Sequence, residues 1–176
     1  MDADTLYNSQ GPMSKQVTCR AAREADLDGV AKLHLHVTRT LGERAPRGYG
    51  AGLRSAADLA QTRAEFAEAL TEADALLLVA ELDGQLAGYA LAVVETAGDD
   101  LLDSPFGTLQ YLVVKEAFRG RGIGKALIER ACDAMRDRGI TVMDLLVWEF
   151  NEEARRLYER CGFSTLERRL VRRLDR

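Results

Sequence analysis

The chain has 176 residues, 47% of them hydrophobic, and a net charge of −4 at pH 7. That length and apolar share suffice to build one domain with one core, which excludes a disordered or fibrous protein. The negative charge argues against a general nucleic-acid binder, because phosphate backbones are held by a clustered excess of Lys and Arg.

Cysteine usage and hydropathy predict a cytoplasmic protein. Cys19, Cys132 and Cys161 are far apart and show no CxxC or Cys/His spacing, which predicts buried thiols in a reducing compartment and no metal site. No run approaches the roughly eighteen apolar residues of a membrane span, so no membrane partner is expected. Residues 1–15 are polar and predict a flexible tail, which leaves 16–176 as a single domain.

The first third of that domain predicts one strand and two helices. Residues 16–21 favour a short strand, and the acids Glu24 and Asp26 mark the start of a helix. The apolar stripe of this helix consists of Leu27, Val30, Ala31, Leu33 and Val37. A glycine-rich loop over 41–53 separates it from a second helix over 56–71. The residues expected to point inward from the second helix are Leu59, Phe66 and Leu70.

The middle of the chain predicts three strands. Two apolar runs, 75–81 and 86–94, are joined by the pair Asp83-Gly84, which is the pattern of a β-hairpin. A third strand is expected over 108–114, directly before a glycine-rich turn.

The last third predicts two helices and two strands. A helix is expected to begin at the glycine-rich turn over 119–124. Its inward residues are Ile123, Leu127, Ala131 and Met135. The apolar run 141–148 predicts a strand buried on both faces. A last helix over 152–161 ends before Gly162, and 163–166 begins a final strand. The whole order predicts an α/β (α+β) fold.

The turn from Arg119 to Gly124 exposes main-chain amides where a strand ends and a helix begins. A helix N-terminus carries a partial positive charge and disfavours cations. Arg121 and Lys125 nevertheless stand there, at a cost of about 0.3–1 kcal/mol each unless an anion occupies the site. The pattern favours a bound phosphate. The alternative is an ordinary glycine turn with solvated surface cations.

Two common phosphate motifs do not fit this turn. A P-loop needs Gly five residues before its Gly-Lys pair and Ser or Thr after it, but Arg119 and Ala126 stand there. A dinucleotide fingerprint needs its third glycine three residues after the second, but Lys125 stands there and Gly124 comes one early. The sequence therefore excludes both kinds of site.

The pattern that does fit is Arg-x-x-Gly-x-Gly over 119–124, after an apolar strand that ends at Val114. A second block reads Asn-x-x-Ala-x-x-Leu-Tyr-Glu-x-x-Gly-Phe over 151–163. In these motifs, and in the order of elements over 16–166, the sequence resembles the GCN5-related N-acetyltransferase (GNAT) family. The resemblance implies the GNAT fold, a mixed central sheet of six to seven strands that splays between the fourth and fifth strands and is flanked by four helices.

The resemblance also implies an activity. Enzymes of this family transfer the acetyl group of the cosubstrate acetyl-CoA to a primary amine of a small molecule, protein or peptide. The amine attacks directly in a ternary complex, and no metal is expected. By resemblance, the CoA pyrophosphate is held by the amides and cations of Arg119, Gly120, Arg121, Gly122, Ile123, Gly124 and Lys125. The pantetheine arm would bind main-chain groups of Leu112, Val113 and Val114 in the splay between 108–114 and 141–148. Core packing of the two valines is compatible with that role.

The second block supplies two further expectations. Tyr158 matches the family tyrosine that faces the thioester sulfur and protonates the leaving thiolate. The alternative is an inward-facing helical tyrosine with a satisfied hydroxyl. Asn151 matches a cofactor contact, but with Glu152 and Glu153 it also has the pattern of a helix N-cap followed by two acids in the first turn.

The general base is not evident. Many family members carry a carboxylate on the strand before the pyrophosphate loop, where this chain has Gln110 and Tyr111. Acetyltransferases of ribosomal-protein N-termini carry a Glu on the following strand, where this chain has Leu146, which weakens an N-terminal-peptide substrate. We expect Glu149 to be the base. The other candidates are Asp144, Glu95, His34 and His36.

The acceptor is expected between the loop 41–53 and the segment 95–103. Four acids on that segment would attract a cationic amine, although a plain polar loop would have the same composition. They are Glu95, Asp99, Asp100 and Asp103.

Two other functions stay open from the sequence. One is a catalytically idle acyl-CoA-binding sensor module, which the missing strand carboxylate favours and Tyr158 disfavours. The other is nucleic-acid binding by the arginines over 168–176, although such alternation with apolar residues more often forms a solvated strand face or tail. The chain after Gly162 is short for the family's final hairpin, so a partner subunit could complete that edge in a homodimer.

Overall fold

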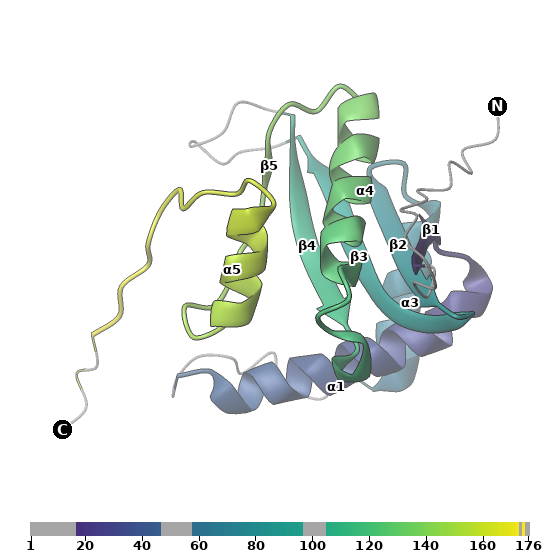
Figure 1. Ribbon diagram of the computed structural model, residues 1–176, viewed down its shortest axis with the longest axis horizontal. Helices are drawn as coiled ribbons and strands as arrows, with labels where there is room; N and C mark the ends of the chain where they lie inside the picture. The colour runs from purple at the N-terminus through teal and green to yellow at the C-terminus, as the bar shows by residue number, and fades with distance from the viewer. Residues whose placement is uncertain (1–16, 47–57, 97–104, 173, 175–176) are drawn as a thin grey trace. The chain divides into compact units, whose positions relative to one another are not determined.

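The computed structural model of the protein describes residues 17–46, 58–96, 105–172 and 174 (Figure 1). The chain divides into two compact units, Met1–Leu146 and Val147–Arg176. The expected tail over 1–15 lies outside the described residues, as do most of the loop 41–53 and the acids Asp99, Asp100 and Asp103.

The first unit is built on a mixed five-stranded sheet in the order β1-β2-β3-β4-β5. Its strands are β1 (Val17–Ala21), β2 (Ala75–Leu82), β3 (Gln85–Glu95), β4 (Phe106–Val114) and β5 (Met143–Asp144). The first four are antiparallel neighbours, and β5 runs parallel to β4. The α/β class and the mixed sheet are confirmed.

The predicted hairpin joins β2 to β3. Asp83 and Gly84 have φ values of 53° and 74°, which is the left-handed pair that a two-residue hairpin turn needs. Position 88 in β3 also requires glycine, since a Cβ at Gly88 would lie 2.5 Å from the Val113 main-chain oxygen of β4. The two strands approach closely at this point because that position has no side chain.

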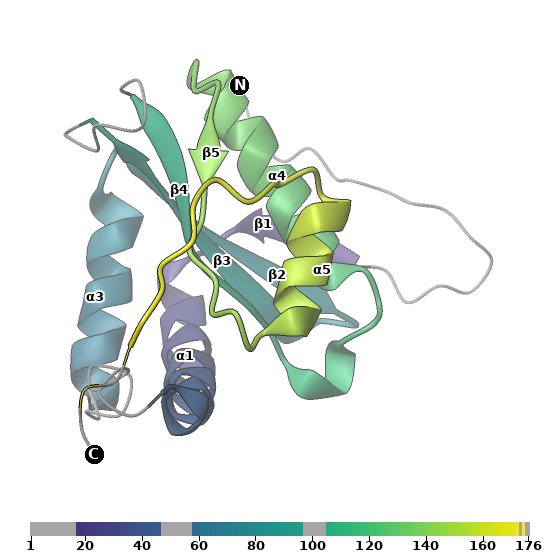
Figure 2. The same ribbon diagram turned by 90° about the vertical axis from the view of Figure 1, so that its left-hand side faces the viewer.

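Helices cover both faces of this sheet (Figure 2). A 3-10 turn, η1 (Glu24–Asp26), leads into α1 (Leu27–Arg44), which packs with α3 (Leu59–Thr71) on one face. The opposite face is covered by α4 (Ile123–Asp137). The predicted stripe of α4 is confirmed, because Ile123, Leu127, Ala131 and Met135 are all buried.

The core between the sheet and the pair α1 and α3 uses alternate strand residues. Its buried members include Leu27, Val30, Phe66, Leu77, Val79, Tyr89, Leu91 and Val113. The inward placement of Phe66 and Leu70 is confirmed, whereas Leu59 is 39% exposed. Leu59 is the first residue of α3, one position after the N-cap Asp58, and a helix end is less well covered than its middle.

The strand predicted over 141–148 is the main error in the fold. Only Met143–Asp144 pairs, with Gly107 and Thr108 of β4, and Leu146 is 94% exposed. A continuous apolar run cannot by itself distinguish a strand covered on both faces from a segment at an edge. No described strand lies on the other side of β5, so the segment is unpaired there.

The second unit contains α5 (Glu152–Arg160), as predicted, followed by Gly162 with φ 92°. The final strand expected from 163 is wrong, because the described residues after α5 form neither helix nor strand. A strand needs an edge to pair with, and the described part of this unit contains none. The described residues thus hold five strands and four α-helices, fewer strands than the six to seven expected.

Candidate active site

The glycine-rich turn connects β4 to α4 through a short 3-10 turn, η2 (Glu116–Phe118). Gly120 and Gly122 have φ values of 72° and 77°, and Gly122 is the N-cap of α4. Left-handed glycines alternating with other residues build concave main-chain surfaces that bind anions. A Cβ at either glycine would meet no atom within 4 Å, so there is open space above the turn.

The amides of this turn are available to a ligand. From Gly120 to Lys125, none donates a hydrogen bond to an acceptor within the described parts of the chain, whereas the amide of Ala126 already bonds to the Gly122 oxygen at 3.0 Å. Such amides at the start of a helix of 15 residues carry the positive end of its dipole. The turn can therefore bind an anion such as a phosphate through its main chain.

The cations of the turn have partners of their own. Lys125 Nζ lies 3.4 Å from Glu129 Oε1, and the Arg121 guanidinium lies 5.8 Å from the centre of the Phe118 ring. Glu129 therefore offsets part of the repulsion between Lys125 and the positive N-terminal end of the α4 dipole. Arg119 and Arg121 are exposed, while the side chain of Ile123 belongs to the core. Only the main chain of Ile123 could contact a ligand.

One edge of β4 is open beside this turn. Beyond Thr108, β4 pairs only with β3 among the described strands. The Lys115 amide bonds to the Ala87 oxygen at 2.8 Å, which fixes the alternation of the antiparallel ladder. Main-chain groups of Leu112 and Val114 therefore point to the open edge, and those of Val113 point to β3.

A β-bulge interrupts β4 in the middle of this edge. Leu91 pairs with Tyr111 but Ala92 pairs with Leu109, which leaves Gln110 as the extra residue. Bulges re-aim side chains and are common beside active sites. This one was not predicted, because an extra residue in a strand has no signature in the apolar alternation of 108–114.

Four rings from four elements meet on the face that α1 and α3 cover. His34 Nδ1 lies 2.6 Å from Tyr89 Oη, and the His34 ring packs edge-on against Tyr111 and Phe66 at centroid distances of 4.7 and 5.2 Å. We call His34, Phe66, Tyr89 and Tyr111 the aromatic cluster. Tyr89 is fully buried, while Tyr111 is 42% exposed.

The titration of the aromatic cluster follows from burial. Burial lowers the pKa of His34 below its usual 6.5, against a smaller opposing effect of Glu65. Burial likewise raises the pKa of Tyr111, and the charge of Glu65 raises it further. At neutral pH the imidazole is therefore uncharged and the phenol protonated. The charge of Glu65, which was not among the sequence candidates, thus acts on both groups.

The second unit holds the other predicted residues. Burial, followed by the nearby Cys161, raises the pKa of Tyr158 to about 12, and its ring packs edge-on against Phe163. Glu149 is mostly exposed and its Oε1 lies 2.8 Å from Arg155 Nη1. Asn151 is the N-cap of α5, but its side chain makes no capping bond. The predicted site residues thus fall into two groups, one in each unit.

The other sequence candidates for a base lie in ordinary surroundings. Asp144 accepts a hydrogen bond from the Thr108 hydroxyl at 2.8 Å, where the β4–β5 pairing ends. His36 is exposed and Glu95 half-buried. Within the described residues, no group of three or more His, Cys, Asp or Glu side chains could hold a metal ion, and no helix is both long and apolar enough to cross a membrane.

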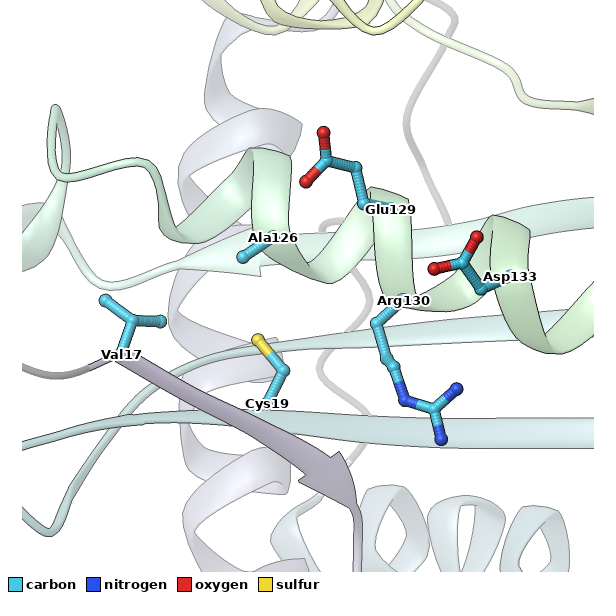
Figure 3. A pocket seen from close by; sticks show the side chains of 6 residues that line it. All are labelled: Val17, Cys19, Ala126, Glu129, Arg130 and Asp133. Carbon is cyan, nitrogen blue, oxygen red and sulfur yellow. The ribbon is translucent and has the colours of Figure 1, made fainter. Parts of the chain in front are cut away.

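A hollow between β1 and the first turns of α4 carries no chemistry of its own (Figure 3). It is lined by Val17, Cys19, Ala126, Glu129, Arg130 and Asp133. Burial raises the pKa of Cys19 to about 11, so its thiol stays protonated and is a poor nucleophile. Cys19, Cys132 and Cys161 form no disulfide within the described residues, and they are half-buried rather than buried as expected.

Comparisons with known proteins agree with the fold. The chain matches the family model "Acetyltransferase (GNAT) family" over residues 47–163, more than half of its length. It is 32% identical over 84 residues to an uncharacterized N-acetyltransferase of Lactobacillus delbrueckii subsp. lactis, covering 48% of this chain and 49% of that protein. It is 42% identical over 62 residues to the mycothiol acetyltransferase of Beutenbergia cavernae, covering 35% of this chain and 21% of that protein.

A solved structure shows the same fold over most of the chain. An aminoglycoside N-acetyltransferase in complex with CoA matches with a TM-score of 0.72 at 21% identity, over 93% of this chain and 98% of that one. This likeness concerns the fold alone. The chain spans about half or less of the length of the two curated relatives, so their whole activities do not carry over to it.

Proposed function

Because the chain belongs to the GNAT family of acetyltransferases, we propose that it transfers the acetyl group of acetyl-CoA to a primary amine by direct attack in a ternary complex. One observation carries this proposal. Among the described residues, the amides from Gly120 to Lys125 donate no hydrogen bond, and they lie next to an open edge of β4. A diphosphate satisfies the first feature, and an arm with two amide groups satisfies the second.

The proposed CoA site combines the turn with the strand. Amides from Gly120 to Gly124 hold the pyrophosphate, and Arg119, Arg121 and Lys125 add positive charge at its rim. From there the pantetheine arm runs back along β4, bonded to the main chain at Leu112 and Val114, with the Val113 side chain supporting the strand from the core. We place the thioester end of the arm level with the bulge at Gln110. Because a strand rises about 3.4 Å per residue, Gln110 lies about 14 Å from Val114 along β4.

Tyr158 and Glu149 are the proposed acid and base. The amine nitrogen attacks the thioester carbonyl carbon, the carbon–sulfur bond breaks, and Tyr158 gives its proton to the leaving thiolate. The phenol carries the proton that this role needs at neutral pH, since burial raises its pKa to about 12. Glu149 would take the amine proton once Arg155 releases its carboxylate. Asn151, whose side chain makes no capping bond, remains available to the cofactor.

A calorimetric titration with CoA, followed by a thiol-release assay with acetyl-CoA and a panel of amines, tests this function. The names of the similar proteins suggest aminoglycosides and amines related to mycothiol as first members of the panel. We expect CoA binding, release of free thiol that depends on the amine, and a product about 42 Da heavier by mass spectrometry, since one acetyl group replaces a hydrogen of the amine.

The same experiment separates the enzyme from an idle acyl-CoA sensor. The absence of a carboxylate at Gln110 and Tyr111 favours a sensor, which would bind CoA but release no thiol with any amine. Failure to bind CoA at all would contradict both functions, since each needs the glycine turn.

A further inference from the structure

The exposed part of the aromatic cluster lies where an acceptor would have to approach. Tyr111 directly follows the extra residue of the bulge and points to the face that α1 and α3 cover, as its ring contacts with His34 and Phe66 show. The same stretch of β4 has an open edge. A group docked on Tyr111 would thus stand beside the place proposed for the thioester.

Exposure distinguishes Tyr111 from a core residue. Tyr89 and Phe66 are 0% and 3% exposed and form the floor of the cluster, whereas Tyr111 keeps 42% of its surface accessible. The exposed surface of a tyrosine ring attracts cations, ammonium groups among them, through its π-electrons.

Glu65 brings a negative charge to the helix that supplies the Phe66 ring of the cluster. It precedes Phe66 in α3, and its charge acts on both Tyr111 and His34. Its Oε1 accepts a hydrogen bond from Gln61 Nε2 at 3.3 Å, and across the described ranges it takes part in no ion pair. His34 is uncharged at neutral pH, so it does not neutralise Glu65.

We propose that Glu65, Tyr111 and His34 form a subsite that receives the protonated amine of the acceptor. The carboxylate of Glu65 pairs with the ammonium, the Tyr111 ring covers it from the side of the sheet, and His34 holds that ring in place. Tyr89 fixes His34 in turn through their 2.6 Å hydrogen bond. The ligand class is a primary ammonium without a carboxylate next to it. The assignment to an acceptor rests on the proposed function, but binding of an ammonium does not.

A titration with tetramethylammonium chloride, a cation that cannot be acetylated, tests the subsite without any catalysis. The readout is the NMR shifts of the Tyr111 and His34 rings, against sodium chloride at the same ionic strength and against tert-butanol as a neutral molecule of similar shape. We expect saturable shifts with the ammonium alone. Glu65→Gln and Tyr111→Leu should abolish them, and Glu68→Gln, one turn along the exposed side of α3, should not.

Kinetics give the second readout. With a cationic amine that the enzyme accepts, Glu65→Gln should raise KM about tenfold, the loss of one charge-assisted contact, with little change in kcat or in CoA affinity. Shifts that sodium chloride reproduces, shifts that persist in Glu65→Gln, or equal KM values for Glu65→Gln and Glu68→Gln would each overturn the subsite. If no amine is acetylated, the titration alone decides, and the proposed function fails separately.

Discussion

The imidazole Nδ1 of His34 lies 2.6 Å from the hydroxyl of Tyr89, and this contact ties α1 to the centre of the sheet. Tyr89 is fully buried, so its hydroxyl needs a partner inside the protein. A neutral imidazole can supply one as donor or acceptor, depending on its tautomer. The pair therefore serves the fold and at the same time sets the orientation of the ring that touches Tyr111.

The first prediction concerns stability and pH. Burial puts the pKa of His34 below the 6.5 of the unfolded chain, so on acidification the unfolded state takes up its proton first. The contribution of His34 is complete above the unfolded pKa and decreases as the pH falls below it, toward the folded pKa. Urea unfolding of wild type and His34→Gln between about pH 8 and about pH 5 should show a steeper loss in wild type.

His36 provides the control, because it lies two residues away on the exposed side of the same helix. His36→Gln should lose stability on acidification as steeply as wild type does. Parallel curves for wild type and His34→Gln would mean that the imidazole is not held neutral by its surroundings.

The second prediction concerns the close approach of β3 and β4. In Gly88→Ala the new Cβ would stand 2.5 Å from the Val113 oxygen and 3.3 Å from the Val114 Cα, both main-chain atoms that cannot rotate away. We expect a loss of about 1–3 kcal/mol in the free energy of unfolding and weaker CoA binding, because the strands separate where the arm is proposed to bond. Chemical denaturation and calorimetry measure the two effects.

Gly29→Ala is the matched comparison. Its Cβ would lie 2.8 Å from Leu86 Cδ2, the far end of a flexible side chain, and in the first turn of α1 Ala is favoured over Gly by up to about 1 kcal/mol. That variant should stay close to wild-type stability. Equal losses in both variants would show that the β3–β4 contact is no tighter than an ordinary side-chain contact.

Local patterns in the sequence sufficed for most of the fold. The pair Asp83-Gly84 specified the hairpin because only left-handed residues close a two-residue turn, and the stripe from Ile123 specified α4 because four buried residues recur on one helical face. The run 141–148 failed for the opposite reason. Whether an apolar segment becomes a covered strand depends on which edges are free, and that is decided by distant parts of the chain.

The candidate site divides in the same way. The glycine turn could be found from its letters, since positive φ values and bare amides are properties of a short segment. The aromatic cluster could not, because His34, Phe66, Tyr89 and Tyr111 come from four elements and each alone has the pattern of a packed residue. Its exposed side depends on the bulge at Gln110, which shifts the register of β4 by one residue.

The third prediction tests the phosphate site. Gly122→Glu places a carboxylate and a strained left-handed residue at the turn, and we expect loss of CoA binding with the fold retained. Gly139→Glu is the matched control, since Gly139 has φ 80°, no atom within 4 Å of a Cβ, and a place at the opposite end of α4. It carries the same backbone strain and charge, and should bind CoA like wild type.

Calorimetry with CoA and a thermal melt of each variant separate the two effects. Similar melting temperatures with binding lost only in Gly122→Glu would locate the pyrophosphate at this turn. Unchanged affinity in Gly122→Glu would place the cofactor elsewhere on the molecule.

The last prediction concerns Tyr158. Burial and the neighbouring Cys161 raise its pKa to about 12, so the hydroxyl keeps its proton at neutral pH. Tyr158→Phe removes only that hydroxyl and keeps the ring that packs against Phe163. General acid catalysis of this kind contributes about 100-fold or more, so kcat should fall by that order while the affinity for CoA changes little. Steady-state kinetics with a saturating amine, alongside calorimetry with CoA, measure the two quantities separately. Glu149 and the ammonium subsite are untouched in this variant. An unchanged kcat would therefore mean that the thiolate leaves without a proton from Tyr158. A loss of CoA affinity as large as the loss in kcat would make the tyrosine part of the CoA site rather than an acid.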